Sequence, residues 1–176
     1  MASIYQLKIT LRGSKPPIWR RIVVPGSIKL SKLHGAILNA MGWSGGHLHE
    51  FITDWGNYGS IEEDDGGWES EVEDERKTRL DQVLVEAKDR LIHLYDFGDS
   101  WEHLVVLEKK LAGITLPGQK PVCLAGKGAC PPEDCGGIYG YYQMLRILKI
   151  PSIPSTRGSR NGLVRILIPT ILTGPT

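Results

Sequence analysis

Residues 5–24 read YQLKITLRGSKPPIWRRIVV, and they predict a β-hairpin near the start of the chain. Apolar and polar residues alternate from Tyr5 to Leu11, as in a strand with one buried face. The five residues after Arg12, GSKPP, suit a turn because glycine tolerates unusual backbone angles and proline cannot donate to a sheet. The return strand is then IWRRIVV, so the chain opens with two antiparallel strands.

The pattern after this hairpin has a helical period. Apolar side chains recur three and four residues apart between Leu30 and Met41, as on the buried stripe of a helix. Ser31 could cap this helix and Gly42 could end it, which predicts a helix at about residues 32–41.

Further strands and a late helix follow. HLHEFITDW (47–55) is predicted to return to the sheet. RLIHLYDF (90–97) and WEHLVVLEKKL (101–111) are predicted to form a second hairpin, because Gly-Asp-Ser separates them. An apolar stripe from Ile138 to Leu148 predicts a helix. Together these patterns predict one α+β domain over residues 1–150, a largely antiparallel sheet packed with helices.

The bulk composition is that of an ordinary globular protein. The 176 residues are 41% hydrophobic and 23% charged, enough for one domain with a core. We find neither an apolar run long enough for a membrane span nor a signal-peptide pattern. Three cysteines are an odd number, which favours a reducing cytoplasm over a disulfide framework.

Histidines and carboxylates supply one set of candidate functional residues. If the fold brought them together, they could hold a metal ion for phosphodiester hydrolysis. In the alternative interpretation the acids of YDFGDSWEH (95–103) only form a turn, and the histidines only satisfy hydrogen bonds at strand ends. The candidates are His47, His49, Glu50, Asp96, Asp99 and His103.

The cysteines are a second set. Cys123, Cys130 and Cys135 lie close together in a loop rich in proline, and a histidine could complete a zinc site. Their spacing lacks the CxxC pair typical of such sites, so cysteines packed beneath a loop are the alternative. No other cofactor is expected.

Basic residues of the first hairpin are a third set. Residues 1–49 carry seven Lys or Arg and no acid, although the whole chain has a net charge of only +1. Such residues beside a tryptophan could contact phosphates and stack on bases, whereas the alternative is an ordinary exposed hairpin with a core tryptophan. The candidates are Arg12, Lys15, Trp19, Arg20 and Arg21.

Several stretches resemble the plasmid pRiA4b open-reading-frame-3-like proteins in the same order, over about residues 3–149. They include the opening hairpin and helix, HLHEF, DERKTRL, YDFGDSWEH and CPPEDCGGIYGYYQML. The resemblance implies an α+β fold of unknown function, often encoded near mobile elements, and it brings no catalytic residues. The chain also lacks a recognisable recombinase, hydrolase or kinase constellation, so an enzyme is not the favoured interpretation.

The C-terminal tail departs from this resemblance. Residues 151–176 contain no acid, whereas similar proteins end in an acidic segment. A neighbouring reading frame can encode that acidic segment, so we hypothesise a frameshift near codon 150 and a poorly ordered tail. The favoured function is then a non-enzymatic module that binds nucleic acid or a protein, and the alternative is a metal-dependent hydrolase.

Overall fold

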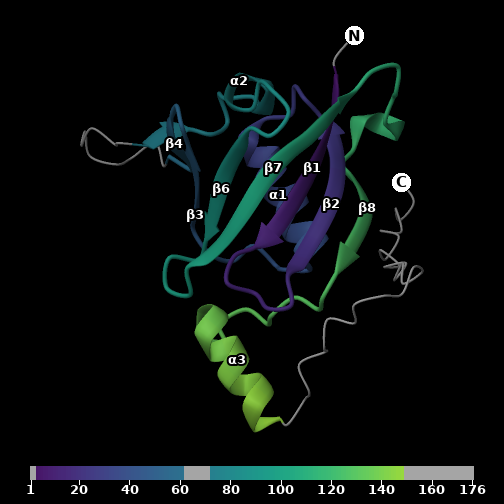
Figure 1. The fold of residues 1–176 in the computed structure, drawn as a ribbon. Helices are drawn as coiled ribbons and strands as arrows, with labels where there is room; N and C mark the ends of the chain where they lie inside the picture. Colours follow the sequence, from purple (N-terminus) through teal and green to yellow (C-terminus); the bar gives the residue numbers. More distant parts are fainter. Residues whose placement is uncertain (1–2, 62–71, 149–176) are drawn as a thin grey trace, which may run out of the picture.

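The computed structural model describes residues 3–61 and 72–148, so the predicted tail at 151–176 lies outside the described residues. One eight-stranded sheet, in the order β5-β4-β3-β6-β7-β1-β2-β8, forms the centre of this part of the chain (Figure 1). All neighbouring strands are antiparallel except β4 and β5. The strands are β1 (Ile4–Leu11), β2 (Ile18–Pro25), β3 (His49–Thr53), β4 (Gly56–Gly59), β5 (Val72–Asp74), β6 (Arg90–Tyr95), β7 (Trp101–Leu111) and β8 (Val122–Lys127).

The opening strand, strand and helix are as predicted. β1 and β2 pair with Leu7 opposite Ile22, which puts the alternating apolar residues on one face. The helix α1 (Leu30–Met41) covers that face and buries Leu33 and Ile37 completely. It begins before the predicted start, so Ser31 lies inside the helix and caps nothing, while Gly42 ends it at φ 93° as expected.

The expectation of a sheet packed with helices is not confirmed, because α1 covers only one face. In Figure 1, α1 lies behind the sheet, α2 (Leu80–Val83) beside its upper end and α3 (Gly137–Ile147) beyond its lower end. Burial alternates along β7: Val105 is buried, while Leu104 and Val106 on the opposite face are only partly covered. We call this opposite side of the sheet the uncovered face, where cover is limited to Leu116 packing against Ile4 and Val23 in the described part of the chain.

The second predicted hairpin is formed by β6 and β7. Its connection runs from Asp96 to Ser100, longer than the predicted three-residue turn, and both of these residues have positive φ. The late helix is α3, which packs only Ile138 and Tyr141 against the core and leaves Tyr139 and Ile147 exposed. None of the helices in the described part of the chain is long and apolar enough to cross a bilayer.

Candidate metal centre

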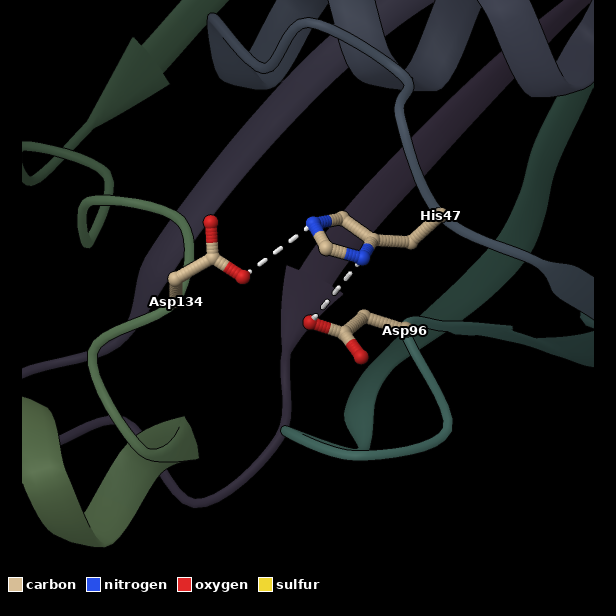
Figure 2. Close-up of side chains that lie close together, drawn as sticks. All are labelled: His47, Asp96 and Asp134. Atoms are coloured by element: carbon tan, nitrogen blue, oxygen red, sulfur yellow. Dashed lines mark ion pairs between the residues drawn. The ribbon is translucent and has the colours of Figure 1, made fainter.

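Three segments that are distant in sequence meet at one end of the sheet. His47 lies just before β3 and Asp96 just after β6. These strands are antiparallel neighbours, with His49 opposite Tyr95, so the start of one adjoins the end of the other. Asp134 comes from the loop before α3, and Figure 2 shows its carboxylate and that of Asp96 on either side of the His47 ring.

The three side chains are close enough to share an ion. His47 Nδ1 lies 3.7 Å from Asp96 Oδ2, and His47 Nε2 lies 3.3 Å from Asp134 Oδ1. One ligand atom from each residue can be chosen so that all three lie within 4.8 Å of one another. Among residues 3–61 and 72–148, this is the one group of three or more His, Cys, Asp or Glu side chains that meets this test.

Asp96 is held firmly by its own loop. Its Oδ1 accepts hydrogen bonds from the backbone N–H groups of Gly98 (3.0 Å) and Asp99 (3.3 Å), while Oδ2 faces His47. The residue is buried and its φ is 57°, a left-handed conformation that aspartate tolerates better than most residues. One carboxylate oxygen therefore forms the turn and the other faces the cluster.

Asp134 is different, because its side chain is 75% exposed. Its φ is 56°, so it too has a left-handed backbone. Within the described ranges, neither Asp134 nor Asp96 forms an ion pair with any lysine or arginine. In the part of the chain that the structure describes, the two carboxylates therefore share the His47 imidazole as their one ion-pair partner.

The loop that carries Asp134 is anchored by the residue before it. Glu133 Oε1 accepts the Tyr95 hydroxyl at 2.6 Å, and Oε2 accepts both the N–H and the hydroxyl of Ser44 at 2.9 and 2.8 Å. Trp43 Nε1 also donates to the Pro131 carbonyl at 2.8 Å. Burial raises the pKa of Tyr95, with a further contribution from Glu133, to about 12, so its hydroxyl remains a donor at neutral pH.

The other predicted catalytic residues do not join this cluster. His49 Nε2 lies 2.8 Å from Glu75 Oε2, and the His49 ring stacks on His34 at 3.4 Å between ring centroids. His103 is buried beside His93. Asp99 Oδ2 accepts the backbone N–H of Gly136 at 3.2 Å. Of the three candidate histidines, His47 is the one that lies in the group with Asp96 and Asp134.

His34, His93 and His103 form a continuous row of imidazole rings, in which His93 and His103 are buried and His34 is partly buried. His34 Nδ1 lies 2.9 Å from His93 Nε2, and His93 Nδ1 lies 3.3 Å from His103 Nδ1. Because His103 Nδ1 also lies 3.2 Å from the His93 carbonyl, which only accepts, this nitrogen carries the proton. Burial lowers the pKa of His34 to about 3 and that of His103 to about 4, and the pKa of His93 falls well below its usual value. These three rings are neutral at pH 7.

The three cysteines lie beside the core. Cys123, Cys130 and Cys135 are free thiols that lie partly buried against the core. They do not belong to a metal-sized group in the described part of the chain. Burial raises the pKa of all three thiols, and that of Cys130 to about 12, so they are protonated at neutral pH.

The basic candidates have different surroundings. Arg20 is buried, and its guanidinium donates to the carbonyls of Ala40, Trp19 and Lys127 at 2.8 to 3.2 Å. It is therefore a structural residue and not a surface contact for phosphate. Arg12 pairs with Glu102 at the surface. Lys15 is exposed, and its backbone bonds the Tyr142 hydroxyl.

Trp19 and Arg21 lie on the uncovered face, so Trp19 is not the core residue of the alternative interpretation. Lys8 Nζ is 5.5 Å and Arg21 Cζ 5.2 Å from the centroid of the Trp19 ring. Arg21 also makes a bidentate pair with Glu108, at 2.6 and 2.8 Å. This pairing reduces the charge that Arg21 can offer to a ligand.

Sequence reasoning missed Asp134 as a possible ligand and Glu133 as its anchor. Neither acid is among the candidate residues that the sequence supplied. In the structure no side chain caps α3, and the Glu133 carboxylate bonds Tyr95 and Ser44 instead. The sequence could show only that Asp134 is a residue type that binds metals. The spacing between residues 47, 96 and 134 gives no indication that they lie close together in the fold.

Comparison with known proteins assigns the chain to a family. Its sequence matches the plasmid pRiA4b ORF-3-like proteins over residues 3–162. It is 37% identical over 148 residues to the uncharacterized protein y4hQ of Sinorhizobium fredii (strain NBRC 101917 / NGR234), covering 84% of this chain and 74% of that protein. The crystal structure of MM3350, a protein of unknown function from Methanosarcina mazei Go1, has a TM-score of 0.70 and 37% identity, with 85% of this chain and 83% of that chain covered. The chain therefore belongs to the plasmid pRiA4b ORF-3-like family.

Proposed function

We propose that this chain is a metal-dependent hydrolase whose divalent cation is held by His47, Asp96 and Asp134. The observation that carries this proposal is the grouping of one imidazole and two carboxylates with ligand atoms within 4.8 Å of one another. Ligand atoms around one ion lie roughly 3–4 Å apart when each metal–ligand distance is about 2.0–2.2 Å. Small side-chain movements would therefore close the group around a cation.

The charges of the site also favour a cation. A buried carboxylate is costly unless it is paired or coordinates a metal. Asp96 is buried, and in residues 3–61 and 72–148 its only ion-pair partner is His47. Two oxygen donors and one imidazole suit a hard or borderline ion such as Mn²⁺ or Zn²⁺.

Three protein ligands would leave coordination positions for water and substrate. A bound cation supplies Lewis-acid chemistry there, because it lowers the pKa of bound water and polarises a phosphoryl or carbonyl oxygen. Asp134, at the exposed side of the group, would be the ligand nearest to solvent and Asp96 the ligand fixed by the fold. A phosphodiester is the substrate class that we propose for this site.

The first test is metal content and metal binding. We expect stoichiometric divalent metal by elemental mass spectrometry of the purified protein, or Mn²⁺ binding by the chelator-treated protein in isothermal titration calorimetry. Asp96→Asn keeps an oxygen for the turn and removes the charge, so we expect cation affinity to fall at least about tenfold. Asp54→Asn, at an exposed aspartate outside the group, is the matched control.

Activity provides the second half of the test. Wild-type protein with Mn²⁺ should hydrolyse bis(4-nitrophenyl) phosphate, and both EDTA and Asp96→Asn should abolish the reaction. Wild-type protein that binds no Mn²⁺, Zn²⁺ or Mg²⁺ would exclude the metal centre. If the protein binds metal but does not hydrolyse the phosphodiester, the metal centre stands and the proposed hydrolase activity is wrong.

A second candidate function is binding of single-stranded nucleic acid at the uncovered face. Trp19 supports it, because a half-exposed aromatic ring beside Lys8 and Arg21 suits base stacking with phosphate contacts. In fluorescence anisotropy with a labelled oligonucleotide, we expect Trp19→Ala to weaken binding and added salt to weaken it further. Trp55→Ala, at an exposed tryptophan on the β3–β4 turn, should leave binding unchanged. Equal binding by the two variants would exclude this surface.

The free cysteines and the uncovered face suggest a location and a partner. Three free thiols favour a reducing cytoplasm. If the uncovered face does not bind nucleic acid, a protein partner is the remaining candidate, since β-sheet faces with half-exposed apolar residues such as Leu104 and Val106 suit such contacts.

A further inference from the structure

Glu133 joins the three segments that supply the proposed ligands. Its Oε1 accepts the hydroxyl of Tyr95, which directly precedes Asp96. Its Oε2 accepts two hydrogen bonds from Ser44, in the segment that leads to His47. Its own backbone continues into Asp134. One side chain therefore connects the three segments that supply His47, Asp96 and Asp134.

Both oxygens of Glu133 are already engaged as acceptors. The Tyr95 hydroxyl donates to Oε1 at 2.6 Å, and the Ser44 N–H and hydroxyl donate to Oε2 at 2.9 and 2.8 Å. Hydrogen bonds to a charged acceptor are stronger than neutral ones. This arrangement suits an anchor better than a fourth metal ligand.

Asp134 needs such an anchor more than its two partners do. His47 and Asp96 adjoin strands of the sheet, and Asp96 is further fixed by the N–H groups of Gly98 and Asp99. The Asp134 side chain is 75% exposed, and its one ion-pair contact within the described ranges is His47. A ligand on an unanchored loop loses conformational freedom when it binds a cation, which weakens affinity.

We propose that Glu133 is a positioning residue that assembles the metal centre by fastening the Asp134 loop to Ser44 and Tyr95. This inference rests on the proposed metal function. Outer residues that orient metal ligands typically change affinity by about 10- to 100-fold when replaced. Glu133→Gln should therefore weaken Mn²⁺ binding by about this factor, because an amide nitrogen cannot accept the bonds that one carboxylate oxygen now accepts.

Calorimetric Mn²⁺ titration of the wild type and of Glu133→Gln, Ser44→Ala and Tyr95→Phe tests this. We expect the largest loss of affinity for Glu133→Gln and smaller losses for the other two variants. With Co²⁺ as the probe, the visible absorption of Glu133→Gln should differ from that of the wild type, because the ligand geometry changes. Circular dichroism and thermal unfolding of the metal-free proteins report any general loss of structure.

The outcomes separate the two proposals. If the wild type binds no Mn²⁺, both the metal centre and this role of Glu133 are wrong. If the wild type binds and Glu133→Gln binds equally well with an unchanged Co²⁺ spectrum, only the positioning role is wrong. If Glu133 were itself a metal ligand, Tyr95→Phe would free its Oε1 atom, and Mn²⁺ affinity would be equal to that of the wild type or higher. That result would also contradict the positioning role. Should Glu133→Gln fail to fold, Ser44→Ala and Tyr95→Phe still decide the matter.

Discussion

The two oxygens of the Asp96 carboxylate have different neighbours. One accepts backbone N–H groups of its own turn, and the other faces His47. The turn chemistry of YDFGDSWEH is readable from the sequence, because Gly, Asp and Ser have known local preferences. The second neighbour is not readable, because it depends on a register between β3 and β6 that no local pattern contains.

Arg20 gives a prediction at the same scale. Its guanidinium joins Ala40 at the end of α1 to Trp19 on β2 and Lys127 on β8. Arg20→Ala would remove three partly buried hydrogen bonds and the packing of a buried side chain, so we expect the free energy of unfolding to fall by about 2–4 kcal/mol. Urea denaturation followed by circular dichroism measures this.

Arg12→Ala is the matched control for Arg20→Ala. The Arg12–Glu102 pair is exposed, so its removal should cost less than about 1 kcal/mol. Equal losses for the two variants would contradict a structural role specific to Arg20.

At the scale of elements, α1 meets β6 and β7 through imidazole rings. His34 comes from α1, His93 from β6 and His103 from β7, and the three form one hydrogen-bonded chain. The sequence correctly predicted each of these elements from its apolar period. The sequence could not predict the hydrogen bonds between these histidines. His34 and His93 stand where an apolar residue would fit the pattern of their helix or strand equally well.

These three histidines predict that the folded protein loses stability in acid. In the folded protein the pKa values of His34 and His103 are about 3 and 4, and that of His93 is also lowered, whereas unfolded histidines titrate near 6.5. Below pH 6.5 the unfolded state therefore binds more protons than the folded state, so stability is fully present above that pH and is lost as pH falls. We expect the free energy of unfolding to decline by on the order of 1 kcal/mol per pH unit for each histidine between about pH 6 and 4.5.

Urea denaturation at a series of pH values measures this slope. His34→Gln removes one titrating group and should make the slope shallower. Carboxylates with lowered pKa values, such as Glu108 and Asp89, contribute mainly below this range. A stability that is constant from pH 7 to 5 would contradict the prediction.

At the scale of the whole molecule, the sheet is asymmetric, with α1 on one face and the uncovered face on the other (Figure 1). The strand-strand-helix opening and the antiparallel sheet were predictable from periodicity alone. The extent of helix cover was not, because an alternating strand such as β7 shows only that one face is buried. Chemical type and turn preference identified His47 and Asp96 as candidates, but the contribution of Asp134 required the whole fold.

The tail gives a prediction at this scale. The eight strands, α1 and α3 all lie within residues 4–147. We therefore expect a chain that ends at residue 148 to keep the thermal midpoint of the full chain within about 2 °C. Thermal unfolding followed by circular dichroism compares the two, and a clearly lower midpoint for the shorter chain would show that residues 149–176 stabilise the domain. Intact mass, with the gene sequence compared against related genes, tests the frameshift itself.

The distance in sequence between the proposed ligands has a consequence for biosynthesis. His47 and Asp96 are translated well before Asp134, and the Glu133 anchor is made just before it. A nascent chain on the ribosome would therefore have the sheet residues of β1 to β8 available before its cation site is complete. Cation capture would be a late event in the life of each molecule, after most of the domain has left the exit tunnel.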